Sequence, residues 1–291
     1  MKRKQKKRIP LWLGILILVV VIGNLFFSKS PSPVTPASTG ELQVHFIDVG
    51  QADCILLMNE NESMLIDAGN NNDGDLVCTY LQSMGITKLD YLIGTHPHED
   101  HIGGLDVVIQ NFDIQNFMMP KFQANTATFE EVLDAALDKN LKITAPKQGD
   151  TFTLGTALVT AVQCYETTKE TNNASIILRV DFGETSFLFT GDAEMEAENA
   201  VLLSGVNIDC DVLKAGHHGS HTSSSRAFLD AVSPEYAVIS CGTGNSYGHP
   251  HKETLQAYEN RNITVYRTDL QGTVRAFTDG KNLRWETAKG G

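Results

Sequence analysis

The sequence lacks the closely spaced cysteines that form a disulfide framework or a zinc knuckle. Its five cysteines, an odd number, are scattered along 291 residues at Cys54, Cys78, Cys164, Cys210 and Cys241. Cys54 and Cys164 lie in apolar stretches typical of strands, where a free thiol packs as a small apolar side chain. We therefore expect buried free thiols.

Basic residues are scarce beyond residue 40. Seven of the 23 Lys and Arg residues precede residue 41, whereas all 35 Asp and Glu residues follow residue 40. The remaining 16 basic residues leave that region with a net charge of −19. Such a surface repels polyanions, which argues against broad nonspecific binding of nucleic acid unless cations or a local polar rim attract the phosphates. Acidity that only keeps an exported protein soluble is the alternative explanation.

Charged residues are missing altogether from residues 11–27, which follow a stretch with six Lys and Arg residues. This segment is at the short end of the range that crosses a bilayer, and it is longer than the core of most cleavable signals. Basic residues before the span predict an N-terminus inside the cell and a domain outside. We expect a cytoplasmic tail at 1–10 and a signal anchor at 11–27, giving a single-pass cell-membrane protein. A secreted protein, after signal cleavage, is the alternative.

A linker and one large domain are expected to follow. Residues 28–40 are rich in Ser, Pro and Thr, which cannot build a core and favour an extended spacer. Within residues 41–291, β-branched or apolar runs predict strands at 42–49, 54–58, 64–66, 91–94, 157–163, 176–182, 186–189, 212–214 and 237–240. Helices are predicted at 75–84, 104–111, 129–139, 194–203, 223–231 and 252–260.

No fixed-period repeat is present, but the two halves of this domain have a similar composition of strands and helices. Such halves favour two sheets packed together with helices outside. An open α/β sheet is equally compatible with the pattern.

Three histidines and an aspartate fall within six residues, at His96, His98, Asp100 and His101, directly after an apolar run. Imidazoles two residues apart in an extended turn project to one side, and the Asp-His pair that follows can face a second point. One segment can therefore serve two cations. Histidine with carboxylate is the ligand set of Zn²⁺ and, less often, of manganese or iron.

Polar residues also end three other hydrophobic runs, at Asp67, Asp192 and His217. The carboxyl ends of strands are where open sheets bind ligands. Asp192 fits equally the N-cap of the helix that follows it. The repetition of the pattern favours a shared site.

Five histidines lie in two segments that contain glycine, at His217, His218, His221, His249 and His251. Glycine beside them allows the backbone to approach a substrate closely. His221 and His251 fit surface positions equally well, and His45 stands apart in the first predicted strand.

Taken together, His-x-His-x-Asp-His and the strand-terminal Asp67, Asp192 and His217 resemble the metallo-β-lactamase superfamily. Residues 46–53, 172–175, 189–192, 216–220 and 247–251 are similar to the hydrolase domain of ComEC-type competence proteins. The resemblance implies a mixed α/β fold, a four-layer αββα sandwich, over residues 41–291. Those proteins carry the domain beside a multi-span DNA-uptake channel, whereas a single predicted anchor precedes it here, so a transport role is not implied.

The resemblance also implies roles for individual residues. A first cation would be held by His96, His98 and the bridging Asp192. A second would be held by Asp100, His101, Asp192 and His217, with Asp67 orienting the water. Asn172 and Asn173 occupy the stretch where many members of the superfamily have a third histidine for the first cation.

The expected reaction follows from a pair of divalent cations, Zn²⁺ or Mn²⁺, which lower the pKa of a shared water to about neutral. The resulting metal-bridged hydroxide would attack a phosphodiester in line. His249 and His218 would bind phosphoryl oxygens or protonate the leaving oxygen, and Asn172, Asn173 and Ser220 would contact the substrate.

The sequence thus predicts a metal-dependent phosphodiesterase or nuclease that acts on DNA or nucleotides outside the cytoplasm. Hydrolysis of a carbonyl substrate, namely a β-lactam, lactone or thioester, is the second reading, and a non-catalytic binding domain is the third. No protein partner is inferred.

Overall fold

The computed structural model describes residues 40–164 and 168–290. The predicted tail and signal anchor, and the linker up to residue 39, lie outside this range. Among the described residues, no helix combines the length and the apolar character needed to cross a membrane.

The first sheet of the described domain has eight strands in the order β15-β14-β1-β2-β3-β4-β5-β6. Strands β3 to β6 run parallel, and the others pair antiparallel. The bounds are β1 Leu42–Phe46, β2 Ile55–Asn59, β3 Glu62–Ile66, β4 Lys88–Ile93, β5 Asp113–Met118, β6 Ile143–Thr144, β14 Val274–Thr278 and β15 Leu283–Thr287.

The second sheet has seven strands among the described residues, in the order β13-β12-β11-β10-β9-β8-β7. Strands β10 to β13 run parallel. The bounds are β7 Thr151–Leu154, β8 Ala157–Gln163, β9 Ile177–Phe182, β10 Thr185–Phe189, β11 Val212–Lys214, β12 Tyr236–Ile239 and β13 Thr264–Arg267.

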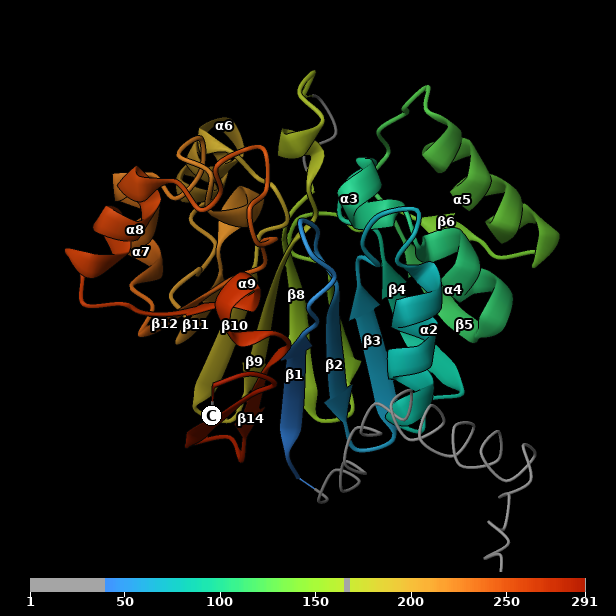
Figure 1. Cartoon of the computed structure of the whole chain (residues 1–291), viewed down its shortest axis with the longest axis horizontal. Coiled ribbons are helices and arrows are strands. Elements are labelled where there is room, and N and C mark those ends of the chain that lie inside the picture. The colour runs from blue at the N-terminus through green and yellow to red at the C-terminus, as the bar shows by residue number, and fades with distance from the viewer. Residues whose placement is uncertain (1–39, 165–167, 291) are drawn as a thin grey trace, which may run out of the picture. The chain divides into compact units, whose positions relative to one another are not determined.

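Helices cover the outer side of each sheet (Figure 1). Those beside the first sheet are α2 Gly74–Ser83, α3 Glu99–Ile102, α4 Leu105–Asn111 and α5 Ala127–Asp138. Those beside the second are α6 Met195–Ser204, α7 Arg226–Val232 and α8 Lys252–Glu259, and a short α9 Thr268–Gln271 follows β13. The side chains of Thr126 and Ser225 cap α5 and α7 by accepting a backbone N–H three residues on.

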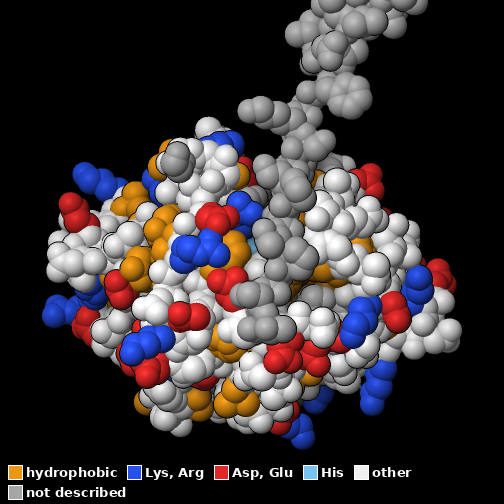
Figure 2. All heavy atoms as spheres, turned by 90° about the horizontal axis from the view of Figure 1, so that it is seen from below, with side chains coloured by type: hydrophobic (Ala, Val, Ile, Leu, Met, Phe, Trp, Pro, Cys, Tyr) orange, Lys and Arg blue, Asp and Glu red, His pale blue; other side chains and the backbone are white. Residues whose placement is uncertain are grey.

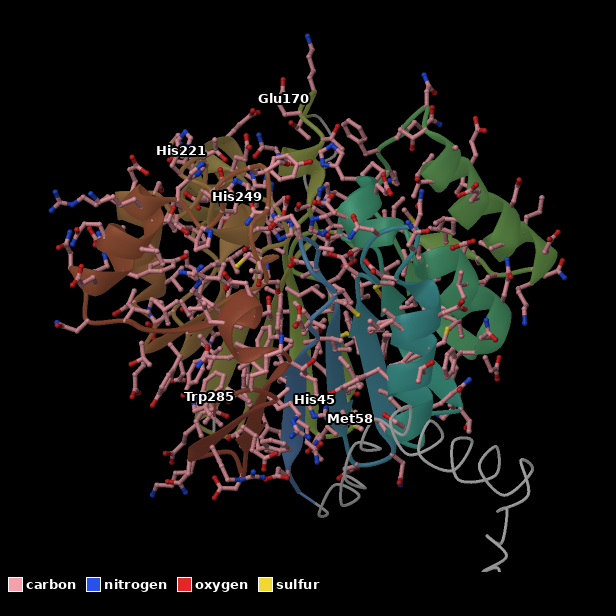
Figure 3. All side chains as sticks on the ribbon, viewed as in Figure 1. His45, Met58, Glu170, His221, His249 and Trp285 are labelled. Atoms are coloured by element: carbon pink, nitrogen blue, oxygen red, sulfur yellow. The ribbon has the colours of Figure 1, made fainter. Side chains whose placement is uncertain are left out.

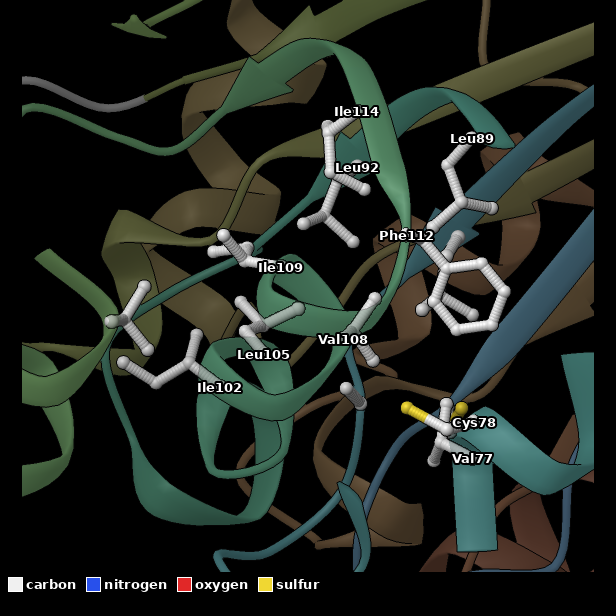
Figure 4. Packing of buried hydrophobic residues seen from close by; sticks show 14 of the residues in the cluster. Val77, Cys78, Leu89, Leu92, Ile102, Leu105, Val108, Ile109, Phe112 and Ile114 are labelled. Carbon is white, nitrogen blue, oxygen red and sulfur yellow. The ribbon is translucent and has the colours of Figure 1, made fainter. Parts of the chain in front are cut away.

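Three separate hydrophobic cores hold these layers together. In β10, Phe187 and Phe189 point into the core between the sheets, whereas Leu188 points into the core under α6 and α7. Figure 4 shows the third core, where side chains of α2, α3 and α4 pack against β4 and β5. Because successive strand residues face opposite sides, a strand between two cores is apolar throughout, which explains the continuous apolar runs.

The structure therefore confirms two packed sheets with helices outside, and an open single sheet is wrong. Cys54, Cys78, Cys210 and Cys241 are buried free thiols as expected, but Cys164 is partly exposed because it follows the end of β8.

The carboxyl ends of β3, β4, β10, β11 and β12 meet at one end of the molecule, the upper end in Figure 1. Figure 3 shows His249 and His221 at this end, and His45 and Met58 at the other. Seen from below, in Figure 2, the opposite face carries acidic and basic side chains interspersed. The predicted site residues thus follow strands that converge at the upper end.

Candidate metal centre

The turn after β4 brings the histidine segment together. His98 is the N-cap residue of α3, so Asp100 and His101 lie in the first turn of that helix. His96 is fully buried, and its Nε2 lies 3.1 Å from Nδ1 of His98. The rings of His96 and His101 have centroids 4.1 Å apart. The predicted segment therefore does present its imidazoles to one region.

Four residues form the centre of the site: Asp100, His101, Asp192 and His218 have donor atoms that all lie within 4.8 Å of one another. His101 Nε2 is 3.2 Å from Asp192 Oδ1, and His218 Nε2 is 3.3 Å from Asp100 Oδ2. His101 Nε2, Asp192 Oδ1 and His218 Nε2 are buried without a hydrogen-bond partner. Converging buried donors of this kind fit a divalent cation.

Asp67 orients His101. Its Oδ2 accepts the Nδ1–H of His101 at 2.7 Å, and Thr95 donates its backbone N–H and its hydroxyl to the two oxygens at 2.8 and 2.7 Å. This fixes the proton of His101 on Nδ1 and directs Nε2 towards Asp192, as an outer carboxylate does in metal sites. The role of Asp67 in orienting a water stays a prediction.

His96 is held from the side away from His98. Its Nδ1 lies 3.2 Å from the Thr95 hydroxyl and 3.3 Å from the Ser175 hydroxyl, which also accepts the backbone N–H of Asp192. Burial lowers the pKa of both His96 and His98 below the usual value. The two imidazoles are therefore neutral at pH 7, the state in which histidine donates to a cation.

The tandem histidines after β11 point to different places. Both His217 and His218 have a positive φ, 48° and 52°, which is unusual for residues with a side chain. His218 is buried in the centre, whereas His217 lies 3.2 Å from Glu194 Oε1 and 3.6 Å from Asp192 Oδ2. The resemblance implies that His217 holds the second cation, and the sequence predicts that His218 binds phosphoryl oxygens or protonates the leaving oxygen. The four-residue centre contains His218 and not His217.

Sequence reasoning missed a buried ion pair behind the centre. Lys214 Nζ lies 2.7 Å from Asp53 Oδ2, and both side chains are at most 1 % exposed. Burial raises the pKa of Asp53, but Lys214 and His218 outweigh burial and hold this pKa well below its usual range. Asp53 Oδ1 is 3.5 Å from His218 Nδ1, which also donates to the carbonyl of Ser240 at 3.0 Å. The charged residue in an otherwise apolar strand was the available signal for Lys214.

The electrostatics of the centre follow from its two carboxylates. Burial by itself lowers the pKa of His218, but Asp192 and Asp53 outweigh burial and raise it to about 10. Burial raises the pKa of Asp100, but His101 and His218 lower it to about 2. The centre thus keeps ionised carboxylates that favour positive charge beside them.

A cleft of about 310 Å³ opens onto this centre. The described residues that line it are Gln51, His98, Glu99, Asp100, Asn172, Asp192, His217, His218, Tyr247 and His249. His249 Nδ1 lies 3.4 Å from the Gln51 amide nitrogen. Burial, followed by the nearby His217 and His218, lowers the pKa of His249 to about 4. His249 is therefore neutral at pH 7.

The three predicted polar substrate contacts are placed differently. Asn172 lines the cleft and donates to Glu194 Oε1 at 3.1 Å. Asn173 is buried, and its Oδ1 accepts backbone N–H groups at the start of α6, including that of Glu194 at 3.0 Å. Ser220 is buried against the Thr222 hydroxyl at 3.0 Å. Substrate contact by these three residues stays a prediction, and only Asn172 is among the described residues that line the cleft.

Asp192 is not the N-cap of α6, since that position belongs to Glu194. The alternative reading of Asp192 as a helix cap is therefore wrong.

Comparisons with known proteins agree with this geometry. The family model for the metallo-beta-lactamase superfamily matches residues 47–243. ComE operon protein 3 of Bacillus subtilis is 32 % identical over 266 residues, which cover 83 % of this chain and 34 % of that protein. Competence protein ComA of Neisseria gonorrhoeae is 30 % identical over 271 residues, covering 92 % and 36 %. The chain thus spans about a third of the length of these relatives.

Solved structures share the fold at low identity. The metallo-beta-lactamase fold protein YhfI of Bacillus subtilis superposes with a TM-score of 0.54 at 14 % identity, covering 84 % of this chain and 100 % of that chain. CmlA, a diiron beta-hydroxylase from Streptomyces venezuelae, superposes with a TM-score of 0.53 at 14 % identity, covering 84 % and 55 %. At these identities the likeness concerns the fold alone.

Proposed function

Because the chain belongs to the metallo-beta-lactamase superfamily of metal-dependent hydrolases, we propose that it cleaves phosphodiester bonds of DNA or nucleotides outside the cytoplasm, with two divalent cations, Zn²⁺ or Mn²⁺. The observation that carries the proposal is the centre of Asp100, His101, Asp192 and His218 at the cleft. His96, His98 and His217 lie beside it and would supply donors for a second cation.

The chemistry of the proposal divides between cations and side chains. Two bound cations would activate a water and neutralise charge that develops on the attacked group. Asp67 holds His101, and Asp53 holds His218, so that the ring nitrogens facing the centre keep their direction. Pre-organised donors of this kind avoid reorganisation during the reaction.

His249 is suited to bind an anionic oxygen. The Gln51 amide donates to His249 Nδ1, so the proton of the neutral ring is on Nε2. That N–H can donate to a phosphoryl oxygen. With a pKa of about 4, His249 holds no second proton at pH 7, so binding of the phosphoryl group is favoured over protonation of the leaving oxygen.

Three features support phosphorus rather than carbonyl chemistry. Asn172 stands at the cleft where many relatives of this superfamily have a histidine. The imidazoles of His98, His217, His218 and His249 line the cleft, and imidazole N–H groups donate to phosphate oxygens. Relatives named for competence favour a nucleic acid as the substrate.

A panel of substrates tests the proposal. The purified chain is incubated with bis-p-nitrophenyl phosphate, nitrocefin and single-stranded DNA, each with Zn²⁺ or Mn²⁺, and with Asp192→Asn as the metal-site control. We expect turnover of the two phosphodiesters and not of nitrocefin. Turnover of nitrocefin alone would support the carbonyl reading, and no turnover with any metal would support a binding domain.

Membrane attachment through residues 11–27 is part of the proposal. It is supported by the basic flank and the uncharged stretch of the sequence. Fractionation of cells that express the full chain, or a chain that starts at residue 28, should place only the former in the membrane. Equal distribution would contradict an anchor.

A further inference from the structure

A row of aromatic side chains continues from the metal centre to the surface. His249 is stacked near His218 at a centroid distance of 6.3 Å and an interplanar angle of 26°. Tyr247 stacks on His249 at 5.6 Å and 22°, and its side chain is 65 % exposed. The His251 ring meets the His249 ring edge-to-face at a centroid distance of 4.8 Å and an interplanar angle of 85°, and the His221 ring lies 4.5 Å from that of His251. Figure 3 shows His249 and His221 on the same upper side of the molecule.

The loop that carries Tyr247 is fixed by its own hydrogen bonds. The Asn245 side chain accepts the backbone N–H of His249 at 3.0 Å and donates to the carbonyls of His249 and Gly242 at 2.6 and 2.9 Å. Gln51 accepts the N–H of Gly242 at 3.0 Å. An exposed ring on a fixed loop loses little freedom when it binds a flat partner.

The outer pair of histidines has a defined arrangement of protons. His251 Nδ1 accepts the backbone N–H of His221 at 3.0 Å, so the proton of the His251 ring is on Nε2. His251 Nδ1 also faces His221 Nδ1 at 2.9 Å, which requires His221 to be the donor of that contact. The pair therefore offers the Nε2–H of His251 as a hydrogen-bond donor on a domain with a net charge of −19.

We propose that the rim made of Tyr247, His251 and His221 binds the nucleotide next to the scissile phosphodiester of a single-stranded nucleic acid. Tyr247 stacks on the base, and the Nε2–H of His251 donates to the phosphate of that nucleotide, while His221 holds the His251 ring in place through its backbone N–H and Nδ1–H. Stacking on an aromatic side chain tolerates every base, because each has a π face. This assignment rests on the proposed phosphodiesterase function, and it names an oligonucleotide rather than an isolated phosphodiester as the preferred substrate.

Stacking is tested by fluorescence, without relying on turnover. A short oligonucleotide with 2-aminopurine and cleavage-resistant phosphorothioate linkages is titrated with the metal-loaded chain. The wild type and Tyr247→Phe should quench the fluorescence, whereas Tyr247→Ala should not, and it should bind on the order of 10-fold more weakly. Equal quenching and affinity in Tyr247→Ala would overturn the role of Tyr247.

The phosphate contact is tested by comparing two substrates. His251→Ala and His221→Ala should raise the KM for an oligonucleotide at least several-fold more than the KM for bis-p-nitrophenyl phosphate, which has no second phosphate. Metal analysis of both variants should match the wild type. Equal effects on the two substrates, or loss of a metal equivalent, would overturn the phosphate assignment, and the latter would make the pair a cation site.

Failure of the inference differs from failure of the proposed function. If the wild type quenches the fluorescence and binds the oligonucleotide but cleaves no phosphodiester, the role of the rim stands and the phosphodiesterase assignment is wrong. If the wild type cleaves bis-p-nitrophenyl phosphate and DNA, and Tyr247→Ala binds the oligonucleotide as tightly as wild type, the phosphodiesterase assignment stands and the role of the rim is wrong.

Discussion

At the scale of single residues, the structure buries two oppositely charged side chains away from solvent. Lys214 and Asp53 are both buried, and each offsets part of the cost of burying the other. Asp53 connects the pair to His218, so the ion pair stands directly behind the metal centre.

Replacing Lys214 with Met should therefore strongly lower the free energy of unfolding. Asp53 would remain as a buried carboxylate without its cation, and loss of one partner of a buried pair costs about 3–5 kcal/mol. Urea unfolding of Lys214→Met measures this loss. The double variant Lys214→Met/Asp53→Asn should recover part of it, and a single variant within 1 kcal/mol of wild type would contradict the argument.

His45 makes stability depend on pH far from the site. Burial, followed by Arg275, lowers its pKa from 6.5 to about 3, and Tyr80 hydroxyl lies 3.0 Å from its Nδ1. Between pH 6.5 and 3, His45 holds a proton in the unfolded chain but not in the folded chain. The free energy of unfolding is therefore unaffected by this group above pH 6.5 and decreases as the pH falls below it. The loss approaches about 1.4 kcal/mol per pH unit.

His45→Gln removes this titration while keeping a polar group for Tyr80. The free energy of unfolding of the variant, followed from pH 7 to pH 4, should fall less steeply than that of wild type. Parallel curves would show that His45 does not contribute to the acid sensitivity.

His249 tests the role of the cleft. His249→Ala should lower turnover of bis-p-nitrophenyl phosphate on the order of 10²-fold, since it removes a donor to the phosphoryl group. Metal content, measured by plasma emission, should equal that of wild type. A variant that loses metal instead would place His249 among the metal ligands.

Residue types and spacing predicted which residues come together at the cleft, but not the direction of each side chain. His96, His98, Asp100 and His101 fall within six residues of the chain, and local geometry brings them together. Which of His217 and His218 points into the centre depends on two positive φ angles, and the sequence does not reveal these angles. The contact of Asp53 with Lys214 joins residues 161 positions apart, and no local pattern reports it.

At the scale of secondary structure elements, one carboxylate organises the start of α7. Glu198 of α6 is buried and accepts the backbone N–H groups of Ser224 and Ser225 at 2.5 and 3.0 Å. These donors precede α7 and lack partners within a helix. The contact ties two helices of the second half together.

Glu198→Ala should lower the free energy of unfolding by about 1–3 kcal/mol, because two buried N–H groups lose their acceptor. Glu198→Gln keeps one acceptor oxygen and should lose less. Thermal unfolding of the two variants gives the comparison, and equal losses would argue against hydrogen bonding as the cause.

The sequence predicted elements better than it predicted their pairing. The predicted strands 157–163 and 212–214 agree with β8 and β11, since one face of β8 is buried along its length and all of β11 is buried. Strands β5, β6, β7, β13, β14 and β15 were missed, and in all of them except β14 most residues are partly or fully exposed. Pairing of β14 with β1 joins residues more than 200 positions apart, and only the folded chain shows it.

At the scale of the whole molecule, the metal centre joins the two sheets. Asp100 and His101 follow β4 of the first sheet, whereas Asp192 and His218 follow β10 and β11 of the second. A cation bound by all four residues binds only the folded arrangement, so metal and folding are linked.

Removal of metal should therefore lower stability. A cation at a free concentration 100 times its Kd should raise the free energy of unfolding by about 2.7 kcal/mol. The Tm of the wild type, measured with Zn²⁺ and after chelation, should differ by several degrees, whereas Asp192→Asn should show a much smaller difference. An unchanged Tm in wild type would argue against a cation shared between the sheets.

The core between the sheets also sets the dimensions of this centre. Phe187 and Phe189 lie in that core, and β10 leads directly to Asp192. A smaller side chain at Phe187 would let the sheets approach or slide, and the separation of His101 from Asp192 would change with them. Metal affinity therefore depends on side-chain packing many residues away from the ligands. Substitution of side chains between the sheets is then a way to change which cation the site retains.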